Sequence, residues 1–316
     1  MKHEKFQTVV GQLNWDAPMY RLYEKANRLG TWNPADIDFS QDVIDFNNLT
    51  ADDKMTATAL VSSFSAGEEA VTIDILPMIE AMARQGRLED TLYLTTFAHD
   101  EAKHVDVFSR WQKAVGIAHM DLSIFHSDSY KRIFYEALPE SMYRLSHDDS
   151  PEAVIKAACV YNLIVEGTLA ETGYYAFRTI FKKAGLLPGL LKAIDYLNQD
   201  EGRHIQFGIY TIQRLVAGNE TLYNVFLNYM DELKPHAFGV VDYLTNLAVE
   251  QRKLKNSQAK LDIPPDLMRD YARKQYDIRM SKIERARKYE NASALEADLN
   301  DDGNLPGEEN LVQELA

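Results

Sequence analysis

Cysteine is almost absent from this sequence: Cys159 is the single cysteine among 316 residues. One cysteine cannot form a disulfide within the chain, which favours a reducing, cytoplasmic compartment. We interpret Cys159 as a small apolar core residue rather than a nucleophile. Basic residues are also few, because 34 Lys and Arg stand against 48 Asp and Glu, a formal net charge of −14. This balance argues against binding of nucleic acid or of anionic membranes, which both need a basic surface.

Long apolar runs are missing as well. The sequence has no uninterrupted run of about 18 apolar residues, so we predict no membrane span. Residues 1–6 lack the apolar core of a signal peptide. Glycine and proline are sparse in the middle of the chain, where helix-forming residues dominate. Hydrophobic residues still make up 46% of the chain, which is enough for a full core.

No segment shows a convincing strand pattern, and helical periodicity predicts an all-α fold. Thr50 followed by acidic residues marks a helix start, and Pro151 marks a first helical position. Gly116 and Gly218 mark helix ends, and Pro77 predicts a kink in the first long helix. We expect a four-helix core with additional helices around it. The four long helices and the three further ones are predicted at 50–84, 88–115, 151–184 and 188–217, and at 129–142, 221–249 and 264–289.

The predicted domain covers residues 1–290, and the acidic tail 291–316 is predicted to be disordered because it has little to bury. The tail also contains a formal match to a calcium loop, with oxygen ligands at alternating positions. The residues of this match are Asp298, Asn300, Asp302, Gly303 and Glu309. Pro306 lies inside the loop and no second calcium loop accompanies it, so we favour a solvated tail.

One phrase, Glu-x-x-His, occurs twice, at Glu101–His104 and at Glu201–His204. Residues three apart lie on one helix face, so each pair can point at one site. A glutamate precedes the first pair on another predicted helix, at Glu68 or Glu69, and periodicity does not decide between the two. A single Glu-x-x-His is common in helical proteins without metal. Two copies with matched upstream glutamates are typical of a helical bundle that binds two metal ions.

The spacing supports this interpretation, because Glu68 lies 33 residues before Glu101 and Glu166 lies 35 before Glu201. Helical hairpins of that length bring the two ends level. We expect the glutamates of the repeated phrase to bridge two metals, with His104 and Glu68 completing one site and His204 and Glu166 the other. Oxygen and imidazole donors suit iron and manganese, and the lack of thiolates argues against zinc fingers or iron–sulfur clusters.

Several segments together resemble the ribonucleotide reductase small-subunit family. They are Trp-Asn-Pro-Ala-Asp-Ile-Asp-Phe-Ser at 32–40, Asp-Glu-Ala-Lys-His at 100–104 and Asp-Glu-Gly-Arg-His at 200–204. The resemblance covers nearly the whole predicted domain and implies a ferritin-like bundle. Within the family, the chain is similar to ligand-binding oxidases that share the reductase fold but not its reaction. This implies a heterodinuclear manganese–iron cofactor, with di-iron as an alternative, and a bound long-chain fatty acid.

The resemblance favours Glu68 over Glu69 and completes the implied ligand set. It also implies that manganese occupies the Glu68/His104 site and iron the Glu166/His204 site. The implied ligands are Glu68, Glu101, His104, Glu166, Glu201 and His204. In such oxidases dioxygen is the oxidant of an unactivated C–H bond, and the family pattern implies an ether cross-link between Val71 and Tyr161. The alternative for this pair is a valine and a tyrosine that only fill the core.

Two further positions bear on the subgroup. Standard reductase small subunits carry a radical tyrosine four residues after the first histidine, whereas this sequence has Phe108 there. Some manganese–iron reductases share the phenylalanine. The segment after Tyr289 contains no aromatic residue, unlike the tails that dock the reductase large subunit. Trp32 and Asp200 match the family's electron-delivery path to His104, with a packing role as the alternative for Trp32.

Small residues accumulate near the proposed ligands on the third and fourth long helices. Glycine inside a helix costs about 1 kcal/mol relative to alanine, so either close packing or space for a ligand is expected. We predict an apolar channel to the metals that holds the fatty acid, against the alternative of ordinary core packing. The residues named for this pocket are Gly167, Ala170, Gly173, Phe207 and Gly208.

We therefore predict an oxidoreductase, a dioxygen-activating manganese–iron oxidase with a lipid-like ligand and an unknown electron donor. A homodimer is implied by resemblance only. The first alternative is the radical-generating small subunit of a manganese–iron ribonucleotide reductase, which would bind a large subunit. The second is a ferritin-like storage bundle, in which Trp32 and Asp200 would have no purpose.

Overall fold

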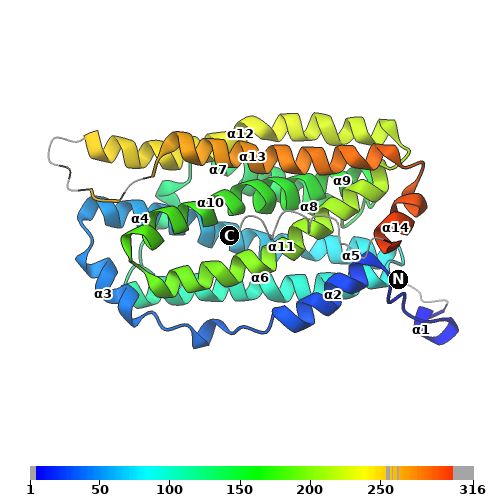
Figure 1. Ribbon diagram of the computed structural model, residues 1–316, viewed down its shortest axis with the longest axis horizontal. Coiled ribbons are helices and arrows are strands. Elements are labelled where there is room, and N and C mark those ends of the chain that lie inside the picture. Colours follow the sequence, from blue (N-terminus) through cyan, green and yellow to red (C-terminus); the bar gives the residue numbers. More distant parts are fainter. Residues whose placement is uncertain (1–4, 254–256, 258, 262, 302–316) are drawn as a thin grey trace.

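The computed structural model describes residues 5–253, 257, 259–261 and 263–301. It is all-α, and no strand occurs among the described residues. Figure 1 shows long helices running nearly along the longest axis of the molecule. The α-helices that cover the first half of the chain are α1 Gln7–Val10, α2 Pro18–Leu29, α3 Ser40–Asn48, α4 Ala51–Asp74, α5 Leu76–Arg84, α6 Leu88–Val115, α7 Asp128–Lys131 and α8 Leu138–Arg144.

The second half of the chain continues in the same way, with α-helices interrupted by tighter and wider turns. Its α-helices are α9 Pro151–Ala158, α10 Glu171–Phe177, α11 Pro188–Val216, α12 Glu220–Lys253, α13 Pro265–Glu284 and α14 Ala292–Asp301. Short 3₁₀ segments are η1 Pro34–Asp36, η2 Leu122–Phe125 and η6 Arg285–Lys288. The π-helical segments are η3 Arg132–Ala137, η4 Cys159–Ala170 and η5 Arg178–Lys182.

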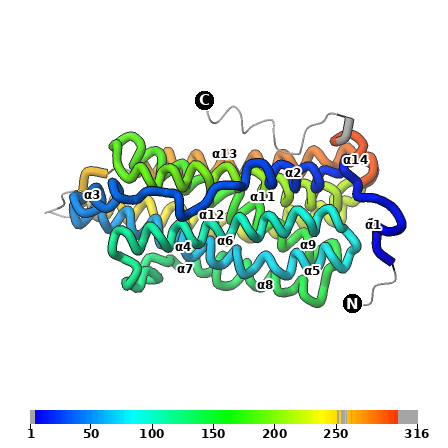
Figure 2. The backbone as a smooth tube through the Cα atoms, turned by 90° about the horizontal axis from the view of Figure 1, so that it is seen from below, coloured from blue at the N-terminus to red at the C-terminus, as the bar shows by residue number. Residues whose placement is uncertain are grey.

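Four helical stretches form the core around the candidate site: α4, α6, the stretch from α9 to α10 through η4, and α11. Contacts join α4 to α6 and α11 to η4, while α12 and α13 cover η4 and α2 covers α6 and α11. Figure 2 shows α2 extended across the face that α6 and α11 present. The predicted ferritin-like four-helix core with extra helices is confirmed.

Local signals in the sequence explain where these helices begin and end. The Thr50 hydroxyl accepts a hydrogen bond from the Asp53 backbone N–H at 3.1 Å and caps α4. Pro77 has no backbone N–H, so the predicted kink appears as a break at Ile75 between α4 and α5. Gly116 closes α6 in the left-handed region at φ +84°.

The third long stretch differs from a uniform helix. Between Cys159 and Ala170 the backbone is π-helical, and the Thr168 hydroxyl donates to the Leu163 carbonyl five residues earlier. Pro151–Lys182 is also the one stretch among the described residues that is long and apolar enough to cross a membrane. Of its most apolar window, 83% is buried inside the bundle. This is the burial of a core helix.

The prediction of a disordered tail from residue 291 was wrong for residues 292–301, which form α14. Leu295 is buried, and the Leu299 carbonyl accepts a hydrogen bond from Arg21 at 3.0 Å. One apolar residue per turn was enough to dock this short acidic helix against α2 and α11. Of the calcium-loop match, Asp298 lies in α14 and bonds Tyr289, whereas Asp302, Gly303 and Glu309 lie outside the described residues.

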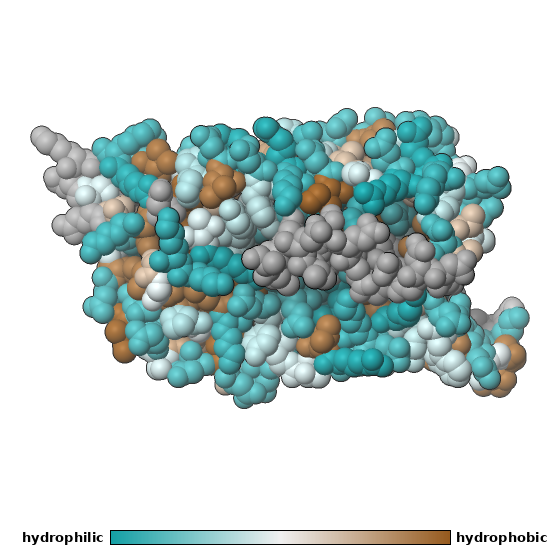
Figure 3. Space-filling view, viewed as in Figure 1, coloured by the Kyte–Doolittle hydropathy of each residue, from teal (hydrophilic) through white to brown (hydrophobic). Residues whose placement is uncertain are grey.

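The surface agrees with the composition. In Figure 3 the visible face is mostly hydrophilic, and its apolar side chains form small separate groups. The hydrophobic core is continuous, and Cys159 lies within it, fully buried. Burial raises the pKa of the Cys159 thiol far above its ordinary value, so it stays protonated and unreactive, as the sequence predicted.

Candidate metal centre

The six predicted ligand residues converge at the middle of the four-helix core. Each of the four core stretches contributes at least one of them: Glu68 from α4, Glu101 and His104 from α6, Glu166 from η4, and Glu201 and His204 from α11. None of the six residues is more than 5% exposed. Burying so many ionisable groups together is unfavourable unless something compensates their charge.

The donor atoms form two overlapping groups. Within each group, one donor atom from every residue lies within 4.8 Å of the others. One group comprises Glu68, Glu101, His104 and Glu201, and the other comprises Glu101, Glu166, Glu201 and His204. Glu101 and Glu201 belong to both groups, as expected for two carboxylates that bridge a pair of ions. The α-helical i,i+3 spacing in α6 and α11 produces this arrangement, because it puts both side chains on one face.

Both imidazoles turn their Nδ1 atoms toward the carboxylates. His104 Nδ1 lies 3.3 Å from Glu68 Oε2 and 3.4 Å from Glu101 Oε2. His204 Nδ1 lies 3.3 Å from both Glu101 Oε1 and Glu201 Oε2, and 3.5 Å from Glu166 Oε1. Several of these atoms are buried without a hydrogen-bond partner among the described residues, including Nδ1 of both histidines and Glu166 Oε1. Buried nitrogen and oxygen atoms that lack hydrogen-bond partners and face one another at this distance are suited to hold metal ions between them.

The electrostatics of the group without metal point the same way. Burial raises the pKa of Glu68 to about 8 and, together with Glu201, raises that of Glu166 well above its ordinary value. Burial opposes ionisation of Glu101 too, but the imidazoles more than offset it and lower its pKa to about 2. Burial disfavours the imidazolium forms, yet the surrounding carboxylates raise the pKa of His104 and His204 well above the ordinary value. Without metal ions, protons bound to these glutamates and histidines offset the negative charge of the buried carboxylates. Bound metal ions would take over that role and displace the protons.

The structure also decides between the two adjacent glutamates of α4. Glu68 is 5% exposed and faces His104, whereas Glu69 is exposed on the outer side of the helix. Val71, one turn after Glu68, is buried on the same inner side. Only Glu68 is placed to be a ligand.

Outside the group, each histidine contacts the aspartate of the other repeat. His104 Nε2 lies 3.4 Å from Asp200 Oδ2, as predicted. His204 Nε2 lies 3.6 Å from Asp100 Oδ2, which the sequence reasoning missed. The signal was present, because an aspartate immediately precedes the glutamate in both copies of the repeat. The exchange of partners between copies follows from the antiparallel packing and is not visible in one sequence.

Two buried cations hold these aspartates, and both stand three residues after an aspartate of the repeat. Arg203 donates to Asp100 at 2.8 Å and to Asp200 at 2.6 Å. Lys103 lies 2.8 Å from Asp100 and 3.3 Å from Asp200. Burial opposes ionisation of Asp100, but His204 and Arg203 lower its pKa to about 2. The pKa of Asp200 is likewise lowered, since His104, Arg203 and Lys103 outweigh burial.

Trp32 lies where the resemblance implied. Its indole Nε1 donates to Asp200 Oδ2 at 2.7 Å, and its ring stacks on Tyr196 with centroids 5.2 Å apart. Lys103 Nζ lies 4.7 Å from the centre of the indole ring. A continuous chain of contacts therefore runs from Trp32 through Asp200 to His104.

Val71 and Tyr161 meet at the edge of the group. The Tyr161 hydroxyl donates to the Val71 backbone carbonyl at 2.9 Å and lies 3.5 Å from Glu101 Oε1. Both residues are buried, and burial with the nearby carboxylates raises the pKa of Tyr161 well above its ordinary value. The phenol stays protonated and is positioned beside the Val71 backbone.

Two residues that the sequence analysis did not name also touch the ligands. Asn162 Nδ2 donates to Glu166 Oε2 at 2.8 Å, and the Tyr174 hydroxyl donates to Glu201 Oε1 at 3.1 Å. Asn162 is four residues before Glu166 and Tyr174 eight after it. Both spacings would have placed them on the ligand face of an α-helix, although the π-helical geometry weakens that argument.

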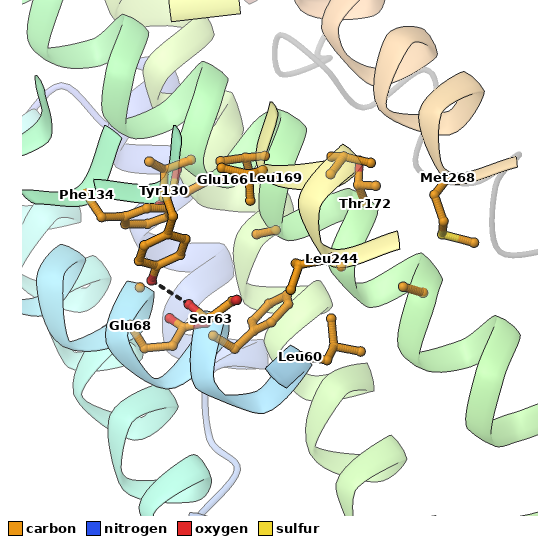
Figure 4. Close-up of a pocket in the computed structure, with 18 of the residues that line it drawn as sticks. Leu60, Ser63, Glu68, Tyr130, Phe134, Glu166, Leu169, Thr172, Leu244 and Met268 are labelled. Carbon is orange, nitrogen blue, oxygen red and sulfur yellow. Dashed lines mark hydrogen bonds between the residues drawn. The ribbon is translucent and has the colours of Figure 1, made fainter. Parts of the chain in front are cut away.

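An apolar pocket adjoins the group between α4, η4, α10 and α12. Glu68, Glu166 and Glu201 lie at its inner end, and the rest of the lining is almost wholly apolar. Figure 4 shows Glu68 and Tyr130 on one side of this pocket and Met268 on the other. The apolar part of its lining includes Leu60, Val71, Leu169, Val240, Leu244 and Ile263.

Of the five residues predicted for a ligand pocket, Ala170 and Gly173 line this cavity. Gly167, Gly208 and Phe207 are not among its lining residues. Gly167 and Gly208 serve close packing instead: a Cβ on Gly208 would lie 2.1 Å from Asn162, and one on Gly167 would lie 3.0 Å from Arg279. Phe207 packs against Tyr93 and Phe97.

Comparison with known proteins agrees with this geometry. The chain matches the family model of the ribonucleotide reductase small chain over residues 12–294. It is 66% identical to a solved R2-like ligand-binding oxidase with an aerobically reconstituted Mn/Fe cofactor (long soak), over 89% of this chain and 98% of that one, with a TM-score of 0.85. A valine-to-leucine variant of an R2-like ligand-binding oxidase, also with an aerobically reconstituted Mn/Fe cofactor, is 65% identical over the same shares, with a TM-score of 0.85.

A tyrosine-to-phenylalanine variant with the same aerobically reconstituted cofactor is 64% identical over 89% of this chain and 98% of that one, with a TM-score of 0.83. An all-α bundle with paired carboxylate–histidine donors at its centre is the architecture of the ferritin-like di-iron and di-manganese carboxylate proteins. The chain belongs to the ribonucleotide reductase small-chain family and, within it, to the R2-like ligand-binding oxidases.

Proposed function

We propose that this protein is a di-metal oxidase that uses a manganese–iron pair and dioxygen to oxidise a C–H bond by two electrons. The observation that carries the proposal is the pair of overlapping donor groups that share Glu101 and Glu201. The Mn/Fe cofactor of the related oxidases supports the choice of metals. When bound, such a pair in the divalent state supplies two of the four electrons that reduce dioxygen to water.

The metal ligands in this proposal are the six buried residues of the two groups. Glu68 and His104 would complete a manganese site and Glu166 and His204 an iron site, and Glu101 and Glu201 would contribute to both. The two ligand sets are nearly alike, so the donors alone do not select this order, and raw affinities favour iron over manganese. Asn162, at 2.8 Å from Glu166, gives the second site an extra hydrogen bond that the first does not have among the described residues.

The first C–H bond to be oxidised is that of Val71, which we propose becomes joined to Tyr161 as an ether. A carbon of the Val71 side chain loses hydrogen, the Tyr161 oxygen loses its proton, and the new C–O bond replaces both. These two residues supply the remaining two electrons, so the protein loses two hydrogens and dioxygen is reduced fully to two waters. The hydrogen bond from Tyr161 to the Val71 carbonyl supports this pairing, since it holds the phenol beside that residue.

The apolar pocket is proposed to hold a long-chain fatty acid with its carboxylate at the metals. Its inner end is formed by three glutamates, and among the described residues no lysine, arginine or histidine lines it. Without metal ions, a carboxylate at that end would be buried with no cation in the lining to compensate its charge. Retention of an acyl chain should therefore depend on metal. Purified metal-loaded protein without a co-extracted acyl chain would contradict this part of the proposal.

Trp32 and Asp200 are proposed to carry electrons to the metals through His104. The indole N–H and the imidazole both contact the same Asp200 carboxylate oxygen, which links the three groups without a gap. The external electron donor is unknown. We also expect a homodimer, by family resemblance, and a cytoplasmic location, because the single cysteine favours a reducing compartment. Light scattering of purified protein at several concentrations tests the dimer.

Intact and peptide mass spectrometry of the reconstituted protein tests the central proposal. Protein loaded with Mn(II) and Fe(II) and exposed to dioxygen should lose two hydrogens, mapped to peptides that contain Val71 and Tyr161. Tyr161→Phe should abolish the loss. Tyr93→Phe is the matched control, because Tyr93 is also a fully buried tyrosine but lies against Phe97 and Phe207. Metal content is measured on the same samples.

Two results of this mass-spectrometry experiment would contradict the proposed function. Bound manganese and iron without a mass change would favour the small subunit of a manganese–iron ribonucleotide reductase, and binding of a large subunit would be the next test. Absence of bound metal would contradict the di-metal proposal altogether. A storage bundle is the weaker alternative, because Trp32, Asp200 and His104 form a connected path that storage does not require.

A further inference from the structure

A second cluster of polar and aromatic side chains lies beside the pocket, away from the six ligand residues. His126 follows η2 and is 8% exposed. Its Nε2 lies 3.2 Å from the Ser62 hydroxyl of α4, and its Nδ1 lies 2.9 Å from the Tyr135 hydroxyl. Its ring stacks on Tyr130 with centroids 4.4 Å apart. Tyr135 is 54% exposed, so the cluster connects the interior to the surface.

The hydrogen bonds determine which nitrogen of His126 carries the proton. Ser62 has a single hydroxyl hydrogen, and it donates that hydrogen to the Leu122 carbonyl at 2.7 Å. The Ser62 oxygen therefore accepts from His126, and Nε2 bears the hydrogen. Nδ1 is left as an acceptor, so the Tyr135 hydroxyl donates to it. Tyr135 and His126 form a phenol–imidazole pair in which the phenol proton points at a base.

Tyr130 connects this pair with the region of the metal ligands. Its hydroxyl donates to the Ser63 carbonyl at 2.7 Å, a bond drawn in Figure 4. The same oxygen lies 3.7 Å from the position that a Cβ on Gly67, the neighbour of Glu68, would occupy. Tyr130 and Glu68 line the same pocket. One stacked contact thus separates the imidazole of His126 from a ring at the edge of the candidate metal centre.

The π-helical segment η3 explains how the cluster is assembled. Tyr130 precedes it, and Phe134 and Tyr135 lie within it. Phe134 turns inward and stacks on Tyr130 with centroids 4.2 Å apart, while Tyr135 turns outward toward His126. A wider helical turn changes the direction of successive side chains, and such turns are frequent at functional sites.

We propose that Tyr130, His126 and Tyr135 form an electron route between the metal centre and the surface, and that the Tyr135–His126 pair is its outer oxidisable site. The proposal rests on the proposed function, which supplies the oxidant. It differs from the path through Trp32, which reaches His104 through Asp200. Its role is to draw an oxidising equivalent out of the core when neither Val71 nor a bound substrate consumes it.

The step balances in atoms and electrons. Tyr135 gives up one electron, which passes by way of the Tyr130 ring to the oxidised metal pair, and its phenolic proton moves to His126 Nδ1. A small-molecule one-electron reductant in solution then reduces the Tyr135 phenoxyl, and the proton returns from His126. Burial lowers the pKa of His126, so the imidazole is neutral near pH 7 and ready to accept a proton. Tyr130 is oxidised only in passing, because its hydroxyl faces the Ser63 carbonyl, which is too poor a base to take the phenolic proton. A phenylalanine ring is much harder to oxidise and would not relay the electron.

Photo-oxidation of the metal-free protein tests the outer pair without relying on the metals. A ruthenium polypyridyl photo-oxidant with persulfate generates the oxidant, and a spin trap marks the oxidised tyrosines for peptide mass spectrometry. Tyr135 should be labelled several-fold more than Tyr143, a tyrosine of α8 with 50% exposure. His126→Gln should remove most of that excess, and Tyr143→Phe should leave it unchanged. Equal labelling of Tyr135 and Tyr143 would overturn the proposal.

Metal-driven oxidation tests the connection through Tyr130. In protein loaded with Mn(II) and Fe(II) and exposed to dioxygen, the molecules that do not form the Val71–Tyr161 cross-link should be labelled at Tyr135, and Tyr130→Phe should lower the label on those molecules several-fold. In Tyr130→Phe, photochemical labelling should persist. Unchanged metal-driven labelling in Tyr130→Phe would overturn the route. If no cross-link forms and no metal binds, the proposed function has failed, and the photochemical result still decides the pair. If His126→Gln does not fold, Tyr135→Phe replaces it, because the substitution is at an exposed position. The label at position 135 should then be absent, and the label at Tyr143 should be unchanged.

Discussion

At the scale of the residue, the two aspartates of the repeated phrase determine how the histidines are oriented. Each aspartate contacts the histidine that belongs to the other copy, and Arg203 and Lys103 hold both aspartates in place. A carboxylate behind an imidazole fixes the ring and makes it a stronger ligand. The charge of Asp100 should therefore matter for the second metal site although it touches no metal.

We predict that Asp100→Asn weakens metal binding at the His204 site by about 10–100-fold. The amide keeps the shape of the side chain but loses the charge that faces His204 and Arg203. Metal titration followed by calorimetry, with bound metal counted after desalting, measures the effect. Asp106→Asn is the control, because Asp106 lies on the same helix but pairs with Arg110 at the surface. Equal affinity in the two variants would contradict the role of Asp100.

Asp74 supports a prediction about pH. It is the last residue of α4 and is 5% exposed, and none of the described residues donates a hydrogen bond to it. Burial raises its pKa from 3.8 to about 6. A raised pKa means that the folded protein binds this proton more tightly than the unfolded chain. The contribution is favourable below about pH 4 and is lost as the pH rises through about 6.

Asp74→Asn should therefore stabilise the protein above pH 6 by about 1 kcal/mol, less than the full shift implies because solvent screens part of the charge. The gain should be much smaller at pH 4.5, where Asp74 is protonated in the folded state, and it should vanish below about pH 3, where Asp74 is protonated in both states. Urea unfolding at pH 4.5 and pH 7.5, followed by circular dichroism, measures both values. A gain of the same size at both pH values would mean that ionisation of Asp74 is not its cause.

At the scale of the element, the π-helical stretch η4 is what brings Glu166 to the centre. It lies between the regular helices α9 and α10, and its neighbours approach closely. Gly208 of α11 leaves the space that Asn162 occupies, and Asn162 in turn donates to Glu166. The close packing of η4 against α11 therefore depends on glycine, which has no side chain, at position 208.

Gly208→Ala should destabilise the fold by about 1–3 kcal/mol, because the new Cβ would lie 2.1 Å from Asn162. Displacement of Asn162 should also weaken metal binding at the Glu166 site. Gly11→Ala is the matched control, since a Cβ there meets only the Gln7 carbonyl at 3.5 Å. Urea midpoints of the two variants provide the comparison, and an unchanged midpoint for Gly208→Ala would show that the two helices can move apart.

At the scale of the whole molecule, charge is distributed in two ways. The chain has a formal net charge of −14, much of it on a hydrophilic surface, and it also buries four ligand glutamates at its centre. Surface charge is solvated, whereas the buried group depends on protons or cations. A ligand that binds only the folded state stabilises it in proportion to the logarithm of its concentration.

Metal removal should therefore lower the stability of the whole bundle. With metal at about 100 times its dissociation constant, the stabilisation should be about 2.7 kcal/mol for each independent site, and a chelator should remove it. Urea unfolding with and without chelator measures the difference. Glu68→Gln should lose the share of this response that comes from the Glu68/His104 site, while Glu69→Gln should keep the whole response, because Glu69 is exposed on the outer side of α4. The same response in both variants would exclude Glu68 as a ligand.

The sequence by itself determined the class of fold, five of the six converging residues and the position of most helix ends. These features follow from local rules, because caps, prolines and i,i+3 spacing act within one helix. The choice of Glu68 over Glu69 needed family resemblance, since two adjacent residues on a long helix differ only in which neighbour they meet. The role of Asp100 was missed for the same reason.

Only the tertiary structure decided which groups meet across helices. It paired each histidine with the aspartate of the other repeat, gave Gly208 to packing rather than to a ligand, and placed Tyr135 against His126. It also docked α14, which the acidic composition of the tail did not predict. Contacts between distant segments depend on how packed helices are rotated about their axes and shifted along them. These two quantities result from many side-chain contacts together, so no local pattern in a single sequence specifies them.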